Sequence, residues 1–408
     1  MMPVRRIHPS VFLVLIVPFG AMGGYLSVAI GYQLTQAGVG VEEVAALIAA
    51  SYIPQTWKFL WAPVADMTLS RKTWYLLAGL VSALGIFVTG AVPADAASLP
   101  LLYAAVLISS VASTFLAMAS ESLMVYNTPP ELQGRAGGWF QAGNLGGNGL
   151  GGGAGLWLAQ TLPEPWMAAA VIAVACAMCC AALWFVPEPP PLPRTGHYGR
   201  MLVEVLKDLW QVVRARAGIL ALLICFLPIG SGAASNLWAA VADDWHASAN
   251  TVALATGVFS GIVSALGCIV GGYGADRMDR KTAYALYGLL MALSTVAMAV
   301  APRTETMYVV FTLIYAFIQG LTYAGFTAVV LETIGLGAAA TKYNLYASLS
   351  NMPIAYMTLV DGWAHTRWGA AGLLNVEAAF GILGIIVFMA VAMVLPRRAL
   401  PESAKQAI

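Results

Sequence analysis

Residues 272–281 read Gly-Tyr-Gly-Ala-Asp-Arg-Met-Asp-Arg-Lys and stand where a long apolar segment gives way to a short basic turn. A related pattern occurs about 210 residues earlier, where Asp66 precedes the pair Arg71 and Lys72 at the end of another apolar run. Two further pairs recur at nearly the same interval: Glu121 with Glu332, and Val186-Pro187 with Leu395-Pro396. Several matches in register over such a distance indicate an internal duplication of the chain.

The composition places the chain in a membrane. Hydrophobic residues make up 60% of its 408 residues and charged residues only 10%, with a mean hydropathy of +0.78. A soluble chain of this length cannot bury so much apolar surface. The 20 Lys and Arg residues nearly balance the 19 Asp and Glu residues, so the net charge favours neither a nucleic-acid partner nor an acidic ligand.

Apolar runs of about 20 residues are long enough to cross a bilayer. Twelve such spans can be read: 11–35, 43–66, 73–93, 99–124, 135–160, 165–186, 218–241, 250–272, 281–300, 306–332, 342–363 and 371–395. The sequence therefore predicts an all-α membrane protein with twelve transmembrane helices in two pseudo-symmetric six-helix bundles, residues 1–186 and 218–408. The polar segment 187–217 between them is expected to be a cytoplasmic linker that ends in an interfacial helix, or else in a solvated helix without lipid contact.

The basic residues predict the orientation. If both termini are cytoplasmic, nearly every Lys and Arg falls in a cytoplasmic segment, and only Arg303 and Arg367 face the other side. The positive-inside rule therefore predicts a multi-pass protein of a bacterial inner membrane with both termini in the cytoplasm. Arg5 and Arg6 resemble the start of a signal peptide, but the long apolar run behind them favours a retained first helix.

Six plus six spans with a basic turn between the second and third span of each half resemble the major facilitator superfamily, whose signature is close to G-x-x-x-D-R-x-x-R-K. Residues 272–281 fit this signature well. In the first copy Ala62 replaces the glycine, and one extra residue separates Asp66 from Lys72. The resemblance covers the whole chain and implies the same twelve-helix fold.

The charged turns are predicted to act as a gate. An Asp can accept hydrogen bonds from the start of a helix in the opposite half, while the basic residues pair with acids at neighbouring helix ends. Glu121 and Glu332 are the expected acidic partners, and the alternative is that these charges only set topology. The predicted gating residues are Asp66, Arg71, Lys72, Arg135, Asp276, Arg277, Arg280 and Lys281.

Residues 51–66 narrow the resemblance. They read Ser-Tyr-Ile-Pro-Gln-Thr-Trp-Lys-Phe-Leu-Trp-Ala-Pro-Val-Ala-Asp, which is similar to a stretch of AmpG-type muropeptide permeases and of their siderophore- and acetyl-coenzyme-A-transporting relatives. Lys58 is the one basic residue deep in a span, so it needs a partner or a water-filled cavity. It is expected either to face the central cavity or to form a permanent structural ion pair. AmpG-like sequences carry a Gln-Asp pair in the fourth span, where this chain has the uncharged run 113–117 and, one turn lower, Glu121.

In this fold the first, fourth, seventh and tenth spans line the cavity. The candidate substrate-binding or coupling residues are Tyr25, Tyr32, Trp57, Lys58, Glu121, Asn236, Trp238, Gln319, Tyr323 and Glu332. Such a neutral, aromatic-rich lining suits an amphipathic organic solute better than a naked ion. The same side chains are equally suited to holding helices together. Glycines 143, 147, 151 and 155 recur every four residues and predict a groove that another helix approaches closely.

The predicted function is a secondary active transporter, specifically a proton-coupled importer of a muropeptide- or siderophore-like solute that works by alternating access as a monomer. Glu121 and Glu332 are the first candidates for the proton carrier, with Asp361 and Glu377 as alternatives on the outer side. Enzymatic activity, a cofactor and a metal site are not expected, because no hydrolase or metal-ligand motif is found. A drug or metabolite exporter of the same fold, or a membrane sensor that does not transport, are the alternatives.

Overall fold

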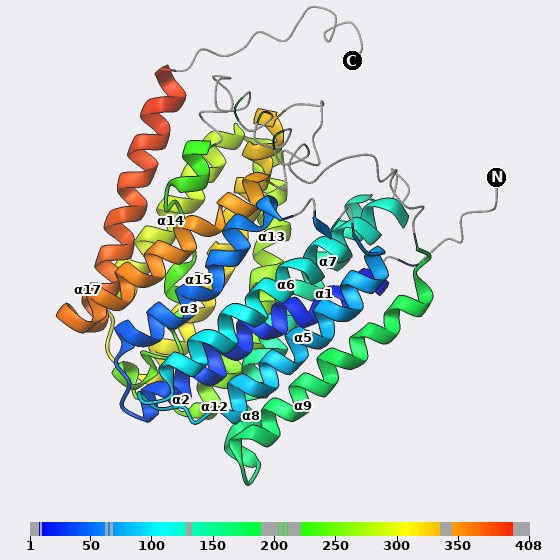
Figure 1. The fold of residues 1–408 in the computed structure, drawn as a ribbon. Helices are drawn as coiled ribbons and strands as arrows, with labels where there is room; N and C mark the ends of the chain where they lie inside the picture. The colour runs from blue at the N-terminus through cyan, green and yellow to red at the C-terminus, as the bar shows by residue number, and fades with distance from the viewer. Residues whose placement is uncertain are drawn as a thin grey trace, which may run out of the picture.

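The structure is a computed structural model that describes residues 8, 10–61, 64–65, 68–127, 133–188, 203, 207, 210, 222–334 and 345–394. Every regular element in these residues is helical (Figure 1). The first half contains α1 (Ser10–Gly24), η1 (Tyr25–Ile30), α2 (Gly31–Gln36), α3 (Val41–Trp57), η2 (Lys58–Leu60), α5 (Arg71–Ala91), α6 (Leu99–Asn127), α7 (Gln133–Gly149), η4 (Leu150–Ala154), α8 (Gly155–Thr161), α9 (Pro165–Met178) and η5 (Cys179–Phe185). The second contains η6 (Ala233–Asn236), η7 (Ala242–Trp245), α12 (Ala249–Val252), η8 (Ala253–Phe259), α13 (Ser260–Arg277), α14 (Arg280–Val300), α15 (Glu305–Ile334) and α17 (Asn351–Val394).

The expected all-α membrane fold is confirmed. In the part of the chain that the structure describes, eight helical segments are long and apolar enough to span a membrane, and the last, Leu345–Val394, covers the final two predicted spans. The other three predicted spans depart from a simple long helix. The α3 helix ends after 17 residues and continues as the 3₁₀ turn η2, and α7 to α8 is rich in glycine. The predicted span 218–241 contains only short helical pieces among its described residues.

The duplication seen in the charged turns extends into the helices that follow them. Both α5 and α14 begin at the arginine of the Arg-Lys pair that closes the motif, Arg71 and Arg280, and run for 21 residues. Each is capped by a short polar side chain: Ser70 accepts a hydrogen bond from the Thr73 amide at 3.2 Å, and Asp279 accepts one from the Thr282 amide at 3.0 Å. The motif therefore marks the start of the same helix in each half, because a polar N-cap satisfies an amide that the helix leaves free.

The last two spans form a helical hairpin. Backbone dihedrals of φ 65° and ψ −167° at Gly369 interrupt α17, where an L side chain would be strained. Figure 1 shows the chain reversing there between the segments coloured orange and red. The predicted spans 342–363 and 371–395 therefore correspond to the two arms of this hairpin.

The glycine groove of α7 receives α1. Side-chain β-carbons placed at Gly143, Gly147 and Gly151 would lie 2.3, 2.4 and 2.1 Å from main-chain oxygens of α1, too close for any residue larger than glycine. The predicted close approach of a helix is thus confirmed. It brings the first and fifth spans together backbone to backbone, as small residues allow inside membranes.

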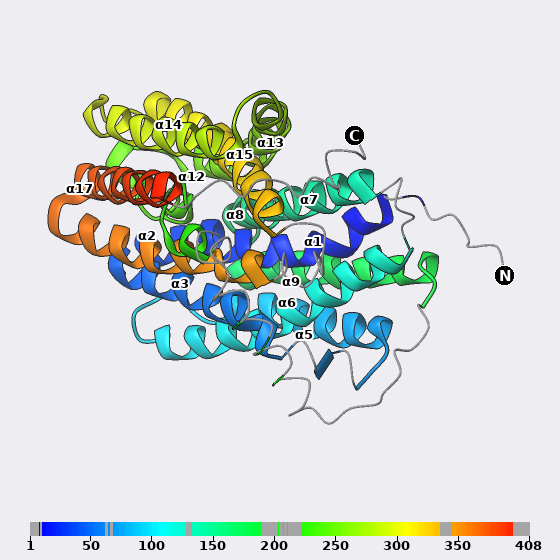
Figure 2. The same cartoon turned by 90° about the horizontal axis from the view of Figure 1, so that it is seen from above.

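The two halves pack against each other at one end of the molecule, which we call the packed end. It contains α2, α8 and α12 and lies opposite the end where α1 begins (Figure 1). The largest hydrophobic cluster contains buried side chains from both halves, and α3 lies along α17. The segments η4 and η8 also meet, so closely that a side chain at Gly153 or Gly257 would clash with the main chain of the other segment. Seen from above in Figure 2, the two groups of helices lie side by side.

Candidate functional site

A stretch of irregular backbone, residues 228–241, occupies the position of the seventh span; we call it the broken segment. Gly230 and Gly232 adopt positive φ values of 56° and 76°, and only the short helix η6 follows. Side chains of neighbouring helices satisfy its main chain: the Thr322 hydroxyl donates to the Gly230 carbonyl at 3.2 Å, and the Tyr308 hydroxyl donates to the Trp238 carbonyl at 2.8 Å. Non-helical backbone at membrane depth is tolerated only where protein buries it or where it lines a cavity, and such breaks mark transporter binding sites.

Hydrogen bonds through the broken segment connect the two halves. The Tyr52 hydroxyl of α3 donates to Asn236 Oδ1 at 3.0 Å, and Asn236 Nδ2 donates to the Thr358 hydroxyl of α17 at 3.1 Å. Asn236 is buried. Its side chain thus joins the second, seventh and eleventh spans, so any separation of the halves at this level must break the bond to Tyr52.

Three further predicted residues surround this bridge. Gln319 Nε2 donates to the Ser235 hydroxyl at 3.4 Å, and Trp238 packs edge-on against Tyr315 with 5.2 Å between ring centroids. Tyr323 is 45% exposed, yet it is close enough to Tyr52 of the other half for an electrostatic interaction. The Trp238 side chain, in contrast, is buried.

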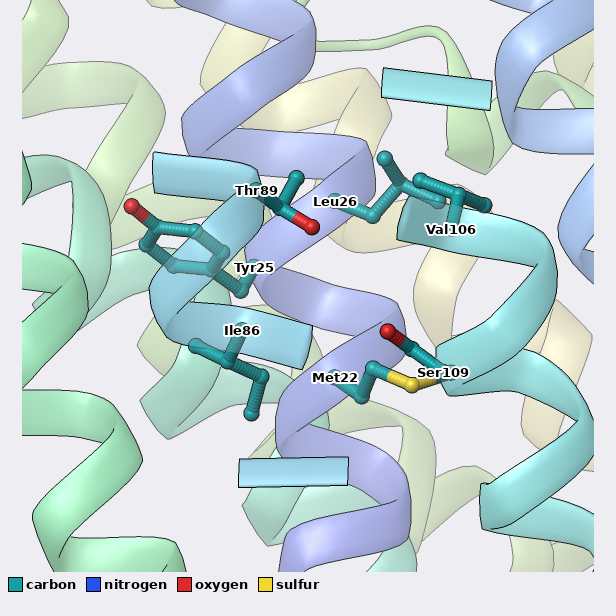
Figure 3. Close-up of a pocket in the computed structure, with 7 residues that line it drawn as sticks. All are labelled: Met22, Tyr25, Leu26, Ile86, Thr89, Val106 and Ser109. Atoms are coloured by element: carbon teal, nitrogen blue, oxygen red, sulfur yellow. The ribbon is translucent and has the colours of Figure 1, made fainter. Parts of the chain in front are cut away.

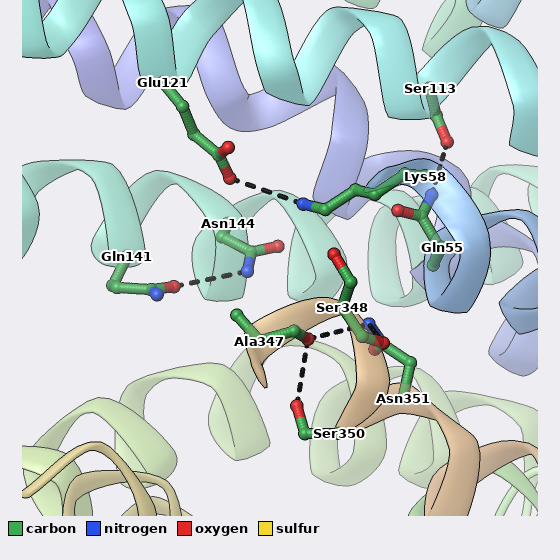
Figure 4. A network of polar contacts seen from close by, with 10 residues as sticks. All are labelled: Gln55, Lys58, Ser113, Glu121, Gln141, Asn144, Ala347, Ser348, Ser350 and Asn351. Atoms are coloured by element: carbon green, nitrogen blue, oxygen red, sulfur yellow. Dashed lines mark hydrogen bonds and ion pairs between the residues drawn. The ribbon is translucent and has the colours of Figure 1, made fainter. Parts of the chain in front are cut away.

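Lys58 and Glu121 form an ion pair within the first half (Figure 4). Lys58 Nζ lies 3.6 Å from Glu121 Oε1, and the two side chains are 12% and 27% exposed. Two other residues of the stretch 51–66 also contact α6. Gln55 donates to Ser113 at 2.8 Å, and the Trp61 indole donates to Thr114 at 3.0 Å. In the described state Glu121 pairs with Lys58, which reaches it from the 3₁₀ turn η2. A pairing of Glu121 with the basic turn stays a prediction.

The three other predicted aromatic residues lie apart from the bridge. Tyr25 is buried and lines a cavity of about 10 Å³ within the first half, enclosed by α1, α5 and α6 (Figure 3). That volume is about what one water molecule needs. Tyr32 is buried near the packed end, within the electrostatic reach of Asp243, and Trp57 ends α3 with 41% of its surface exposed.

The first basic turn is held inside its own half. The amides of Arg71 and Lys72 donate to the two oxygens of Glu188, each at 3.0 Å. Arg71 Nε donates to the Ser122 hydroxyl at 2.6 Å, and its guanidinium lies 4.5 Å from the centre of the Tyr126 ring. A carboxylate at the start of α5 interacts favourably with the free amides and the helix dipole. Glu188 was not predicted, although an acid directly after the sixth span was a visible signal.

The remaining gate predictions fall largely outside the described residues. Arg277 is the exposed last residue of α13, and Arg280 and Lys281 form the first turn of α14. The following lie outside the description, entirely or in their side chains: Asp66, Arg135, Asp276 and Glu332. A latch between the halves therefore stays a prediction.

Polar contacts close the packed end. Gln36 Nε2 of the first half donates to Asp243 Oδ2 of the second at 2.8 Å, and His365 Nε2 lies 2.6 Å from Asp244 Oδ2. The guanidinium of Arg303 lies 4.2 Å from the Trp245 ring centre. Burial lowers the pKa of Arg303, while the nearby negative charge of Asp244 opposes that shift.

Two acids that were second choices from the sequence lie beside the broken segment. Glu377 Oε2 accepts a hydrogen bond from the Ala234 amide at 2.9 Å, and Glu377 Oε1 accepts one from the Tyr315 hydroxyl. Asp361 is fully buried and interacts with Glu377. Tertiary structure places these acids next to the site, because both arms of the α17 hairpin contact the broken segment.

Comparison with known proteins agrees with this architecture. The family model described as Major Facilitator Superfamily matches residues 11–358. Among solved structures, the chain is similar to a bacterial homologue of the human lysosomal transporter Spinster in an inward-facing, unoccupied conformation (TM-score 0.74, 12% identity, 98% of this chain and 100% of that one). It is also similar to the nucleoside transporter NupG (0.70, 14%, 94% and 98%) and to a D-xylose-proton symporter (0.69, 16%, 93% and 96%). No curated protein matches the chain. Because this family model matches most of its length, the chain belongs to the major facilitator superfamily.

Proposed function

We propose that this chain is a proton-coupled importer of an amphipathic organic solute in a bacterial inner membrane, with both termini in the cytoplasm and residues 187–217 linking the halves. The observation that carries the proposal is the hydrogen bond from Tyr52 to Asn236 on the broken segment. It joins the halves through irregular backbone, the arrangement that transporters use at a binding site between rocking bundles. In the proposed orientation the packed end faces outward, so the described state is closed to the outside.

The chemistry around the bridge favours binding through the neutral sugar, amide or aryl groups of a solute. Two phenols and two amides, from Tyr52, Tyr323, Asn236 and Gln319, offer donors and acceptors beside aromatic faces. The nearest predicted cation, Lys58, has its charge offset by Glu121. Aromatic faces with a few polar groups suit sugar-like or aryl groups. This supports a muropeptide- or siderophore-like cargo of the AmpG-type branch.

Uptake into proteoliposomes tests the proposal. The purified chain is reconstituted and offered labelled anhydromuropeptide, an aryl-capped ferric siderophore, a nucleoside and a pentose, with and without an inward proton gradient. We expect one of the first two to accumulate only with the gradient. Accumulation of a solute on the opposite side would indicate the exporter. Binding without accumulation in either direction would indicate the sensor, and a sodium-driven signal would refute proton coupling.

A matched pair of variants locates the site within the same assay. Tyr323→Phe removes a hydroxyl that interacts with Tyr52 of the other half, whereas Tyr273→Phe removes one from the exposed face of α13. We expect the first to raise the solute concentration needed for half-maximal uptake and the second to leave it unchanged. Equal behaviour of the two variants would move the site elsewhere.

A further inference from the structure

The hairpin of α17 brings two acids to the same depth in the molecule. Asp361 lies eight residues before the turn at Gly369, and Glu377 lies eight residues after it. At 1.5 Å per residue, both therefore stand about 12 Å from the turn, one on each arm. Their carboxyl groups interact with each other across the hairpin.

The surroundings of the two carboxyls are very different. Glu377 is 5% exposed and accepts hydrogen bonds from the Ala234 amide, at 2.9 Å, and from the Tyr315 hydroxyl. Asp361 is 0% exposed, and no described residue offers a hydrogen to either of its oxygens. An ionised Asp361 would thus be a naked charge in a dry interior, which is costly inside a membrane protein.

The interaction between the two acids bears on their protonation state. Two carboxylates that share a buried site cannot both ionise cheaply, because like charges repel strongly where water is excluded. A proton on Asp361 removes the repulsion and supplies the missing hydrogen bond, since Asp361 can then donate to Glu377. Glu377 is suited to accept that hydrogen bond, because the Ala234 amide and the Tyr315 hydroxyl already donate to its oxygens.

We propose that Asp361 and Glu377 form the proton-binding site of this transporter, with the transported proton carried by Asp361 and held against the carboxylate of Glu377. The inference rests on the proposed proton-coupled function and names the residues that perform the coupling. Uptake transfers one proton from hydronium to the Asp361 carboxylate and leaves water; release is the reverse transfer to water on the other side. Glu121 and Glu332, the first choices from the sequence, are not needed for this step.

Hydrogen bonds connect the acid pair to the interface between the halves. Thr358, three residues before Asp361 on the same arm of α17, accepts a hydrogen bond from Asn236, which in turn accepts one from Tyr52 of the first half. The Ala234 amide that donates to Glu377 belongs to the same broken segment as Asn236. Loss of the proton would create two adjacent charges, and relieving their repulsion requires this hairpin to shift against the broken segment. Proton release is thereby linked to the bond that joins the halves.

The other titratable groups that face the pair are few. Tyr315 of α15 donates to Glu377, and Tyr52 of α3 is reached only through Asn236. On α17 itself, His365 lies one turn beyond Asp361 and is bonded to Asp244. Among the described residues, Glu377 is the charged group that acts on Asp361.

The pair is a property of the second half alone. The equivalent helix caps Ser70 and Asp279 are 209 residues apart. With the same interval, the first-half counterparts of Asp361 and Glu377 are Gly152 and Ala168. Both equivalents are buried and neither carries a titratable group. The acid pair therefore distinguishes the second half from the first.

Two measurements on the full chain test the proposal with the proton itself as probe. Infrared difference spectra in lipid, recorded while the pH is raised, report the carbonyl stretch of a protonated carboxylic acid. Transient currents from proteoliposomes on a solid-supported membrane report charge movement after a pH jump without solute. We expect the wild-type protein to keep a protonated-acid band into alkaline pH and to give a transient current. Asp361→Asn should lose both, because the amide has no proton to release.

Matched variants make the outcome decisive. Glu164→Gln changes an exposed acid at the start of α9 whose side chain does not cap the helix, and it should keep both signals. Glu377→Gln, which serves if the first variant fails to fold, should keep the band but shift its titration, because the neighbouring charge is gone. If Asp361→Asn retains the infrared band and the transient current, the inference is overturned. Gradient-driven uptake is measured separately, and its presence would leave the proposed function standing. Asp361-dependent signals without gradient-driven uptake of any solute would support the proton site and refute the coupled import.

Discussion

Replacing Gly153 by alanine should drive the two halves apart at the packed end. A β-carbon at this position would lie 2.5 Å from the carbonyl oxygen of Ala253, which is main chain and cannot rotate away. Ordinary contacts between nonbonded heavy atoms require about 3.5 Å or more, so η4 and η8 must separate by roughly 1 Å. Overpacking of this kind costs about 1–3 kcal/mol. That free energy corresponds to a shift of about 5- to 150-fold toward states in which the packed end is open.

Gly146 provides the matched control. It lies seven residues before Gly153, in α7, and a β-carbon there would meet no heavy atom of another described residue within 4 Å. Gly146→Ala should therefore be neutral, or stabilising by about 0.4–1 kcal/mol through the unfolded chain.

Spin-label distances across the packed end measure the outcome. Labels on Ala37 and Asn250, both exposed and on opposite halves, are introduced after replacement of the five native cysteines. The Gly153→Ala variant should show a larger population at long distance, and Gly146→Ala should match the parent. An unchanged distribution in Gly153→Ala, or an equal shift in both variants, would refute the idea that glycine contacts hold this end closed.

Three further changes probe the network around the site. Tyr52→Phe leaves Asn236 Oδ1 without its donor, so the packed state should lose about 1–3 kcal/mol and the same spin labels should report opening. Lys58→Ala should abolish uptake without lowering expression; normal uptake would remove this lysine from the mechanism. In a thermal double-mutant cycle with Glu121→Gln, the coupling should be about 1 kcal/mol or less, because the ion pair is partly exposed and 3.6 Å long. Glu188→Ala removes the acceptor for two amides at the start of α5 and should cost about 0.5–2 kcal/mol in detergent unfolding, with Glu188→Gln losing less. Equal melting temperatures for Glu188→Ala and the parent would exclude this cap.

Local patterns in the sequence predicted most of the fold. Apolar run length predicts spans because a bilayer imposes one thickness, and the charged turns of residues 66–72 and 272–281 predict the duplication because each precedes a helix of the same length. The glycine period of α7 likewise predicted a close helix contact, since only the absence of a side chain permits it. These features depend on neighbours within a few turns, so a single sequence suffices to see them.

The arrangement of the site was decided by tertiary structure. Lys58 was singled out from the sequence, but its partner Glu121 follows from the 3₁₀ turn that redirects the end of α3. The break at Gly230 did leave a signal, because Pro228, Gly230 and Gly232 interrupt the apolar run, but the predicted span 218–241 passed through it. Asp361 and Glu377 were read as two separate acids, because nothing in the order of residues shows that a hairpin folds them against each other. Length, hydropathy and repeats are properties of the chain, whereas a shared proton depends on which side chains water cannot reach, and only packing determines that.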